Sequence, residues 1–195
     1  MRDGDGFSAV VLVGGRSTRM CTDKALLRVD GELLIERQLR CLREAGAGEL
    51  LISANRSGEY SRFGATVIPD EHADAGPLGG LAAALRAASF QRLLVLAVDL
   101  PAMTAAMLGK IISLCSENFA CVPVDDSGFQ PLAAAYHKAL LPLAQRQLNA
   151  GKYSMRDFVT VAVAEGLVHY LQVLPDEQIQ FTNWNRPGEW TELSR

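Results

Sequence analysis

A strand-like apolar run that leads straight into a glycine-rich, cationic loop constrains this chain more than any other feature. Residues 8–24 read SAVVLVGGRSTRMCTDK. Two adjacent glycines allow the backbone to turn tightly and to present N–H groups to a ligand. Successive N–H groups in such a loop bind anions, and cationic side chains add charge-assisted hydrogen bonds. The segment therefore predicts a triphosphate site that uses the cations Arg16, Arg19 and Lys24.

The spacing of this loop excludes two familiar phosphate-binding motifs. It lacks the Gly-x-x-x-x-Gly-Lys-Ser/Thr pattern of the P-loop. No third glycine follows Gly14 and Gly15 at the required distance, so the dinucleotide-binding fingerprint also fails. The simpler alternative is a tight strand-to-helix turn whose basic residues are only solvated.

Apolar strand-like runs alternate with helix-length segments along the chain. The expected strands are Phe7–Val13, Leu50–Ala54, Thr66–Pro69, Arg92–Val98, Phe119–Val124, Pro131–Tyr136 and Leu167–Val173, and the expected helices are Leu33–Ala45, Leu78–Ala88, Ala105–Cys115, Leu140–Asn149 and Ser154–Ala164. This alternation predicts a three-layer, Rossmann-like α/β fold with a mostly parallel sheet and helices on both faces. The 195 residues suggest one domain, residues 1–195, which ends in a polar tail.

Charge and cysteine usage narrow the class of protein. The formal net charge of −3 gives no electrostatic case for nucleic acid or an anionic membrane. No Cys-x-x-Cys pair is present, and Cys41 and Cys115 fall among apolar residues as reduced core thiols. Neither a signal peptide nor a membrane-spanning run is recognisable. These features predict a cytoplasmic protein.

The first loop closely resembles the Leu-x-Gly-Gly-x-Ser-x-Arg-Met-Gly-x-Asp-Lys signature of nucleotidyltransferases, and most closely that of the molybdenum cofactor guanylyltransferases (the MobA family). The resemblance implies the nucleotidyltransferase fold and a GTP site that includes Leu12, Val13, Gly14, Gly15 and Lys24. One departure is Cys21, which stands where the family has glycine. If that position needs a positive φ, cysteine is strained there.

Further family-like segments follow the expected strands, where ligands bind in such sheets. Asn55, in Ser-x-Asn-Arg, is implied to lie near the guanine base, and its simpler interpretation is a turn-forming residue. Asp70 and Gly76, in a segment resembling Asp-x-x-x-x-x-Gly-Pro-Leu-x-Gly, are implied to contact the nucleotide. Asp99, in Val-Asp-Leu-Pro, matches the family's Mg²⁺ ligand, and its simpler interpretation is a helix cap. The family more often has Cys or Gly where this chain has Val98.

Two later segments resemble the acceptor side of the family's site. Gln130 and Pro131 match a Gly-x-x-x-Pro-Leu segment, and Asn183 and Asn185 match Phe-x-Asn-x-Asn-x-Pro near the C-terminus. Alternate residues of an extended segment point the same way, so both asparagines are expected to face the site. The simpler interpretation of the latter segment is a turn before a short helix that starts near Pro187.

The resemblance implies transfer of GMP from GTP to the terminal phosphate of molybdenum-bound molybdopterin, with release of pyrophosphate. Arg19, Lys24 and Asp99 are the implied catalytic residues, and Mg²⁺ on Asp99 is the implied cofactor. The expected partners are GTP and a molybdopterin-type acceptor, with transient contacts to other molybdenum cofactor proteins, and the chain is expected to be a monomer. Two alternatives are a cytidylyltransferase of the same fold, acting on molybdopterin or on a sugar or polyol phosphate, and a non-catalytic nucleotide-binding regulator. The cytidylyltransferases more often have Ala-Ala-Gly where this chain has Val13-Gly14-Gly15, so the resemblance favours guanine over cytosine. The presence of Lys24 and Asp99 argues against loss of catalysis.

Overall fold

A mixed β-sheet forms the middle layer of the protein in the computed structural model, which describes residues 6–13, 23–54, 59–69 and 75–184. The sheet order is β10-β7-β9-β6-β1-β4-β5, and β8 pairs with β7. The strands are β1 (Ser8–Leu12), β4 (Glu49–Ser53), β5 (Thr66–Ile68), β6 (Arg92–Ala97), β7 (Ala120–Asp125), β8 (Gly128–Phe129), β9 (Ala133–His137) and β10 (Val168–Gln172). The helices are α1 (Leu34–Glu44), α2 (Gly76–Ala87), α3 (Ala105–Ser113), α4 (Leu141–Asn149) and α5 (Met155–Ala164).

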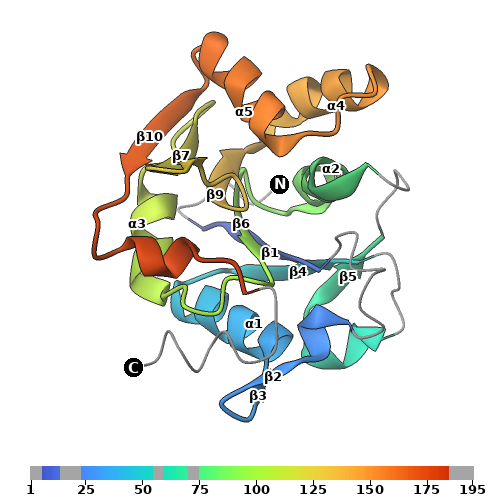
Figure 1. Ribbon diagram of the computed structural model, residues 1–195. Helices are drawn as coiled ribbons and strands as arrows, with labels where there is room; N and C mark the ends of the chain where they lie inside the picture. The colour runs from blue at the N-terminus through green and yellow to red at the C-terminus, as the bar shows by residue number, and fades with distance from the viewer. Residues whose placement is uncertain (1–5, 14–22, 55–58, 70–74, 185–195) are drawn as a thin grey trace.

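Helices cover both faces of this sheet. One core cluster joins the sheet to α1 and α3, and a second joins it to α2, α4 and α5 (Figure 1). All five residues of β1 are buried, as are all those of β6 after Arg92, because each central strand is covered on both sides. The predicted three-layer α/β fold is confirmed, and the predicted helices and strands are present with ends shifted by one or two residues.

The hydrophobic pattern of the sequence did not predict the direction of β9. Strands β5, β4, β1 and β6 are parallel to one another, whereas β9 is antiparallel to both β6 and β7. Strand β10 is parallel to β7. The amino end of β9 therefore lies at the same edge of the sheet as the carboxyl ends of β6 and β7.

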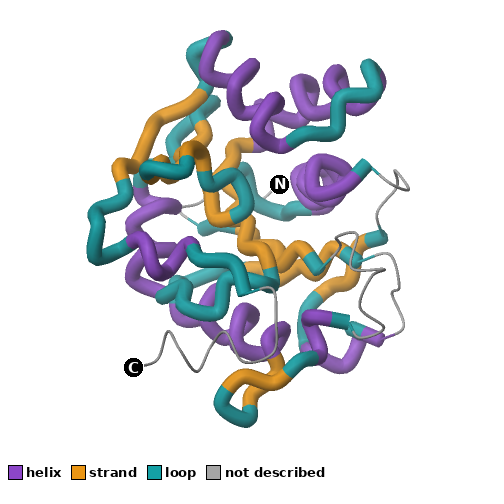
Figure 2. Tube along the Cα trace, in the orientation of Figure 1, coloured by secondary structure: helices purple, strands orange, loops and turns teal. Residues whose placement is uncertain are grey.

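A short hairpin before α1 was also not predicted. Strands β2 (Arg28–Val29) and β3 (Glu32–Leu33) are antiparallel, and Figure 2 shows them apart from the main sheet. Both turn residues have positive φ, 51° at Asp30 and 84° at Gly31. This is the conformation that an Asp-Gly pair favours in a two-residue hairpin.

Two helix starts follow their expected local chemistry. The hydroxyl of Thr104 accepts a hydrogen bond from the N–H of Met107 at 3.2 Å and so caps the start of α3. Ser154 caps α5 in the same way, accepting from the N–H of Asp157 at 3.2 Å. Within the described residues, none of the helices combines the length and the apolarity needed to cross a bilayer.

The segment after β10 packs against α3, although its sequence is mostly polar. Its 3₁₀ helix, Gln178–Phe181, buries Phe181, and Trp184 beyond it is also buried. Lys110 of α3 forms an ion pair with Glu177 at 3.0 Å. The predicted short helix near Pro187 lies outside the described residues.

Candidate functional site

The segments that leave the parallel strands begin side by side at one edge of the sheet. The N–H of Val13, just after β1, donates to the carbonyl of Ser53 at the end of β4, at 3.0 Å. The N–H of Val98, just after β6, donates to the carbonyl of Leu12 at 3.2 Å. Leu12 and Val13 thus sit between the ends of β4 and β6, where the sequence placed the nucleotide.

Asp99 lies in the turn directly after β6 and is partly buried. Burial raises the pKa of its carboxyl group above the ordinary value, while the positive charge of Lys24 and the backbone N–H of Asp99 act to lower it. Lys24 is therefore close enough to influence Asp99 electrostatically. A carboxylate that burial has partly stripped of water is stabilised by any added cation, which is a property of many functional sites.

The turn that presents Lys24 is held from two sides. Lys24 begins a 3₁₀ helix, Lys24–Leu26, and the carboxylate of Asp23 caps this helix by accepting from the N–H of Ala25 at 3.0 Å. The hydroxyl of Tyr60 donates to the other carboxylate oxygen of Asp23. Tyr60 is only 2% exposed, and the sequence analysis did not predict its contribution. No local pattern marks it, because its partner lies 37 residues away.

Two glycines shape the start of α2 at this edge. Gly76 has a φ of +60°, a conformation that residues with a side chain rarely adopt. A Cβ atom on Gly80 would come within 2.8 Å of the hydroxyl oxygen of Ser53, so the absence of a side chain lets α2 pack closely on β4. Backbone conformation at Gly76 and close helix packing at Gly80 thus explain why glycine occupies these positions.

The predicted acceptor residues Gln130 and Pro131 precede β9, whose reversed direction brings them to the same edge. The side-chain amide of Gln130 donates to the carboxylate of Asp125 at 2.8 Å. Pro131 is buried, and its carbonyl accepts from the hydroxyl of Tyr136 at 2.8 Å. Gln130 is therefore the more accessible of the two.

The C-terminal segment returns to Asp99. The backbone N–H of Trp184 donates to the backbone carbonyl of Asp99 at 2.8 Å. Asn183, the preceding residue, is exposed. The structure thus brings one of the two predicted asparagines beside the Asp99 turn, across 84 positions of the chain (183 minus 99).

The remaining predicted positions lie outside the described residues, and their roles stay predictions. They are Gly14, Gly15, Arg16, Arg19, Cys21, Asn55, Asp70 and Asn185. The last described residues before the segments that contain these positions are Val13, Ala54, Pro69 and Trp184. Val13 and Ala54 directly follow β1 and β4, and the N–H of Ala54 donates to Ile68 at the end of β5 at 3.2 Å.

The Asp99 carboxylate at this edge suits a metal ion that takes only one ligand from the protein. Among the described residues no group of three or more His, Cys, Asp or Glu side chains is arranged to hold a metal. Mg²⁺ needs few protein ligands, because substrate phosphates and water complete its coordination. Asp99, a carboxylate oxygen donor under the influence of the charge of Lys24, fits such an ion.

The described cysteines do not take part in this chemistry. Cys41, Cys115 and Cys121 are free and buried. Burial raises the pKa of Cys41 and Cys121 to about 11 and that of Cys115 to about 12. These thiols are therefore protonated at neutral pH and poorly nucleophilic.

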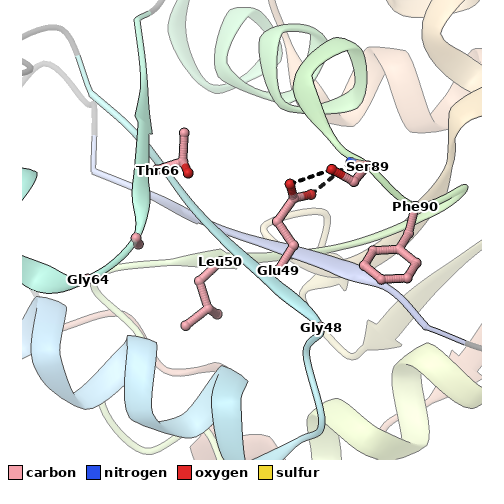
Figure 3. Close-up of a pocket in the computed structure, with 8 residues that line it drawn as sticks. Gly48, Glu49, Leu50, Gly64, Thr66, Ser89 and Phe90 are labelled. Carbon is pink, nitrogen blue, oxygen red and sulfur yellow. Dashed lines mark hydrogen bonds between the residues drawn. The ribbon is translucent and has the colours of Figure 1, made fainter. Parts of the chain in front are cut away.

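A cavity of about 390 Å³ lies at the opposite edge of the sheet, at the amino ends of β4 and β5 (Figure 3). The Glu49 carboxylate in its wall accepts hydrogen bonds from the Ser8 hydroxyl at 2.5 Å and from the N–H and hydroxyl of Ser89 at 2.8 and 2.7 Å. Hydrogen bonds from Ser8 and Ser89 thus satisfy the Glu49 carboxylate and link three segments of the chain. The arrangement is structural and lies away from the strand ends that carry the predicted site.

Comparison with known proteins agrees with the geometry. Residues 9–167 match the MobA-like NTP transferase domain family. The chain is 39% identical to a probable molybdenum cofactor guanylyltransferase from Opitutus terrae, over 94% of this chain and 92% of that protein. It is 38% identical to the molybdenum cofactor guanylyltransferase of Xanthomonas euvesicatoria pv. vesicatoria, over 96% and 94% of the two chains.

A solved structure supports the same relationship. The crystal structure of molybdopterin-guanine dinucleotide biosynthesis protein A from Archaeoglobus fulgidus superposes with a TM-score of 0.73 at 26% identity. The match covers 95% of this chain and 96% of that one. The fold is therefore similar over nearly the full length of both chains.

Proposed function

The chain belongs to the MobA-like NTP transferase domain family, and from this membership we propose that it is a molybdenum cofactor guanylyltransferase. The proposed reaction transfers GMP from GTP to the terminal phosphate of molybdenum-molybdopterin and releases pyrophosphate. Relatives named for this activity are 38–39% identical over more than nine-tenths of the chain. This breadth supports the whole activity and not only a nucleotide-binding module.

The observation that carries the proposal is the place of Asp99, a partly buried carboxylate in the turn directly after β6, at the edge of the sheet where the charge of Lys24 acts on it. The two residues come from segments that are 75 positions apart (99 minus 24). A carboxylate and an ammonium group so placed can act on a triphosphate together. The carboxylate would hold a divalent cation, and the ammonium group would neutralise charge on the phosphates.

The proposed reaction is a direct displacement at phosphorus. An oxygen of the acceptor phosphate forms a bond to the α-phosphorus of GTP, the bond from that phosphorus to the β-phosphate oxygen breaks, and pyrophosphate leaves with the electron pair. No protein nucleophile is needed, so the protein contributes positioning and charge stabilisation. Lys24 and Arg19 are proposed to stabilise the departing pyrophosphate.

Asp99 is the proposed protein ligand of Mg²⁺. When bound, Mg²⁺ supplies positive charge that offsets the repulsion between the phosphate groups of the two substrates. The chain's own contribution is to hold the Asp99 carboxylate in place. The turn does so through the hydrogen bonds of Val98 to Leu12 and of Trp184 to Asp99.

The remaining roles follow the order of the segments. The N–H groups of Gly14 and Gly15 are proposed to bind the phosphates, Asn55 to bind the guanine base, and Asp70 and Gly76 to contact the rest of the nucleoside. Gln130, Asn183 and Asn185 are proposed to border the acceptor. The place of Gln130 at the same edge of the sheet as Asp99, and that of Asn183 beside the Asp99 turn, support this division.

Calorimetry with GTP, CTP, ATP and UTP in the presence of Mg²⁺ tests the choice of nucleotide. A site that hydrogen-bonds one base leaves buried polar groups unpaired with another, so GTP should bind at least about 100-fold more tightly than CTP. Equal binding of CTP and GTP would contradict the guanylyl assignment and favour a cytidylyltransferase. A guanylyl transfer assay with molybdenum-molybdopterin then separates the enzyme from a protein that only binds nucleotide.

A further inference from the structure

Gln38 is a polar side chain buried inside the apolar face of α1. It is only 1% exposed. The other buried residues of this helix are apolar: Leu34, Ile35, Leu39, Cys41 and Leu42. A buried amide is costly unless hydrogen bonds satisfy it, so its partners indicate why it is there.

The partners of Gln38 lie on both sides of Asp99. Its amide nitrogen Nε2 lies 2.8 Å from the backbone carbonyl oxygen of Leu100 and 3.4 Å from that of Val98, and donates to both. One planar amide, with its two N–H groups, thus bonds to the carbonyls of the two residues that flank Asp99 in the chain. These contacts span 60 and 62 positions of the chain.

Neighbouring contacts leave the turn little freedom to move. Arg37, the residue before Gln38, donates from Nε to the carbonyl of Pro101 at 2.7 Å. The N–H of Trp184 donates to the carbonyl of Asp99 itself at 2.8 Å. The four successive carbonyls from Val98 to Pro101 therefore all accept hydrogen bonds. Gln38 provides the buried part of this set, whereas Arg37 is 24% exposed.

We propose that Gln38 is a positioning residue that fixes the Asp99 carboxylate for Mg²⁺ binding. This inference rests on the proposed function, in which Asp99 is the metal ligand. A metal-binding constellation must be held within about 0.5 Å of its productive geometry by locked neighbours. Gln38 meets that need because it is buried and bonds to the peptide group that leads into Asp99 and to the carbonyl of Leu100, the residue that follows Asp99.

Binding of Mn²⁺, a spectroscopic substitute for Mg²⁺, tests the proposal without relying on turnover. Electron paramagnetic resonance would measure the affinity of the full-length chain for Mn²⁺ in the presence of a non-hydrolysable GTP analogue. Gln38→Met keeps the length of the side chain and removes both donors. We expect it to weaken Mn²⁺ binding about 10- to 100-fold, the range typical when a partner that orients a metal ligand is lost. Affinity for the analogue without metal should stay unchanged.

Two further variants keep the test decisive. Gln38→Asn retains both N–H groups but draws them back by one methylene, so it should fold and still weaken Mn²⁺ binding. Leu42→Ala removes buried volume one turn further along α1 and serves as the matched control for loss of stability, since Leu42 is completely buried. It should lower the melting temperature without changing Mn²⁺ affinity.

Asp99→Asn separates failure of this inference from failure of the proposed function. If Asp99→Asn loses Mn²⁺ but Gln38→Met and Gln38→Asn bind it like the wild type, Gln38 only stabilises the fold and the inference is wrong. The same conclusion follows if Leu42→Ala weakens Mn²⁺ binding as much as the Gln38 variants at equal loss of stability. If Asp99→Asn binds Mn²⁺ normally, the proposed metal ligand itself is wrong.

Discussion

The hydroxyl group of Tyr60 donates a hydrogen bond to the carboxylate of Asp23, which caps the turn that begins at Lys24. Tyr60 follows the segment that contains Asn55, the proposed guanine-binding residue, by five positions. One hydrogen bond therefore connects the segment proposed to bind the base with the turn proposed to bind the phosphates. We expect the two parts of the nucleotide site to depend on each other through this contact.

Tyr60→Phe should weaken GTP binding about 10-fold, because Asp23 loses one of its partners and the Lys24 turn loosens. Hydrogen bonds to charged groups contribute about 1.5–3 kcal/mol, so the free energy of unfolding should fall by a similar amount. Calorimetry and urea denaturation measure the two effects. Tyr136→Phe is the matched control, since it removes another buried tyrosine hydroxyl, the one bonded to Pro131. A Tyr60→Phe protein that loses stability but binds GTP normally would show that the contact is purely structural.

Lys24→Ala should lower kcat/KM by about two to three orders of magnitude, the effect of losing one preorganised electrostatic contact in a transition state. Thermal stability should change little, because a partly exposed lysine contributes little to folding. Lys24 also lowers the pKa of Asp99, so its removal should let that pKa rise further. The acidic limb of the pH–rate profile should then move to higher pH. The exposed Lys152, replaced by alanine, is the control and should change neither the rate nor the profile.

A Lys24→Ala protein that is clearly less stable, yet keeps its activity per folded molecule, would contradict the phosphate-binding role. It would instead make Lys24 a structural ion-pair partner. The activity of the folded fraction is therefore the deciding measurement.

Glu49→Gln should reduce stability at neutral pH and have little effect in acid. Burial alone raises the pKa of the Glu49 carboxyl, but hydrogen bonds from Ser8 and Ser89, together with the charge of Lys138, bring it below the ordinary value. A carboxyl group with a lowered pKa in the folded state contributes stability that is present above the pKa of the unfolded chain. That contribution is lost as the pH falls through the folded-state pKa.

Urea denaturation between pH 3 and pH 7 checks this expectation. The difference between wild type and Glu49→Gln should be on the order of 1 kcal/mol near pH 7 and should shrink toward zero at the acidic end. Replacing the exposed Glu117 by glutamine provides the control. A difference that stays constant across this range would mean that shape, and not the ionised carboxylate, matters at this position. GTP affinity should stay unchanged, because Glu49 lies at the edge opposite the proposed nucleotide site.

Local chemistry allowed much of the fold to be predicted from sequence. The continuous apolar run of β6 and the N-cap Thr104 each contain their own structural signal within a few residues. The position of Asp99 was predictable for the same reason, since it follows a buried strand of a mostly parallel sheet. The Asp30-Gly31 pair is also a local signal for a hairpin. Its two strands have only two residues each, however, which is too short for a recognisable strand pattern.

Long-range pairings account for what could not be predicted. The pattern of β9 gives no indication of its direction, because an alternating or buried strand looks the same when it runs either way. Gln38 lies within a helical stretch, and only the folded structure reveals that its amide meets Val98 and Leu100. Trp184 belongs to a polar tail by composition, yet its N–H bonds to Asp99.

The reversed direction of β9 also bears on how such an enzyme can diversify. The proposed nucleotide-side residues occur at or before Asp99, whereas the proposed acceptor-side residues occur from Gln130 onward. Because β9 runs antiparallel to β6, the residues just before β9 lie at the same edge of the sheet as the carboxyl ends of the parallel strands. If this division holds, mutations in the second half of the chain should change the choice of acceptor and leave GTP binding intact. Hybrid chains that join the first half of one relative to the second half of another should then take the acceptor of the second.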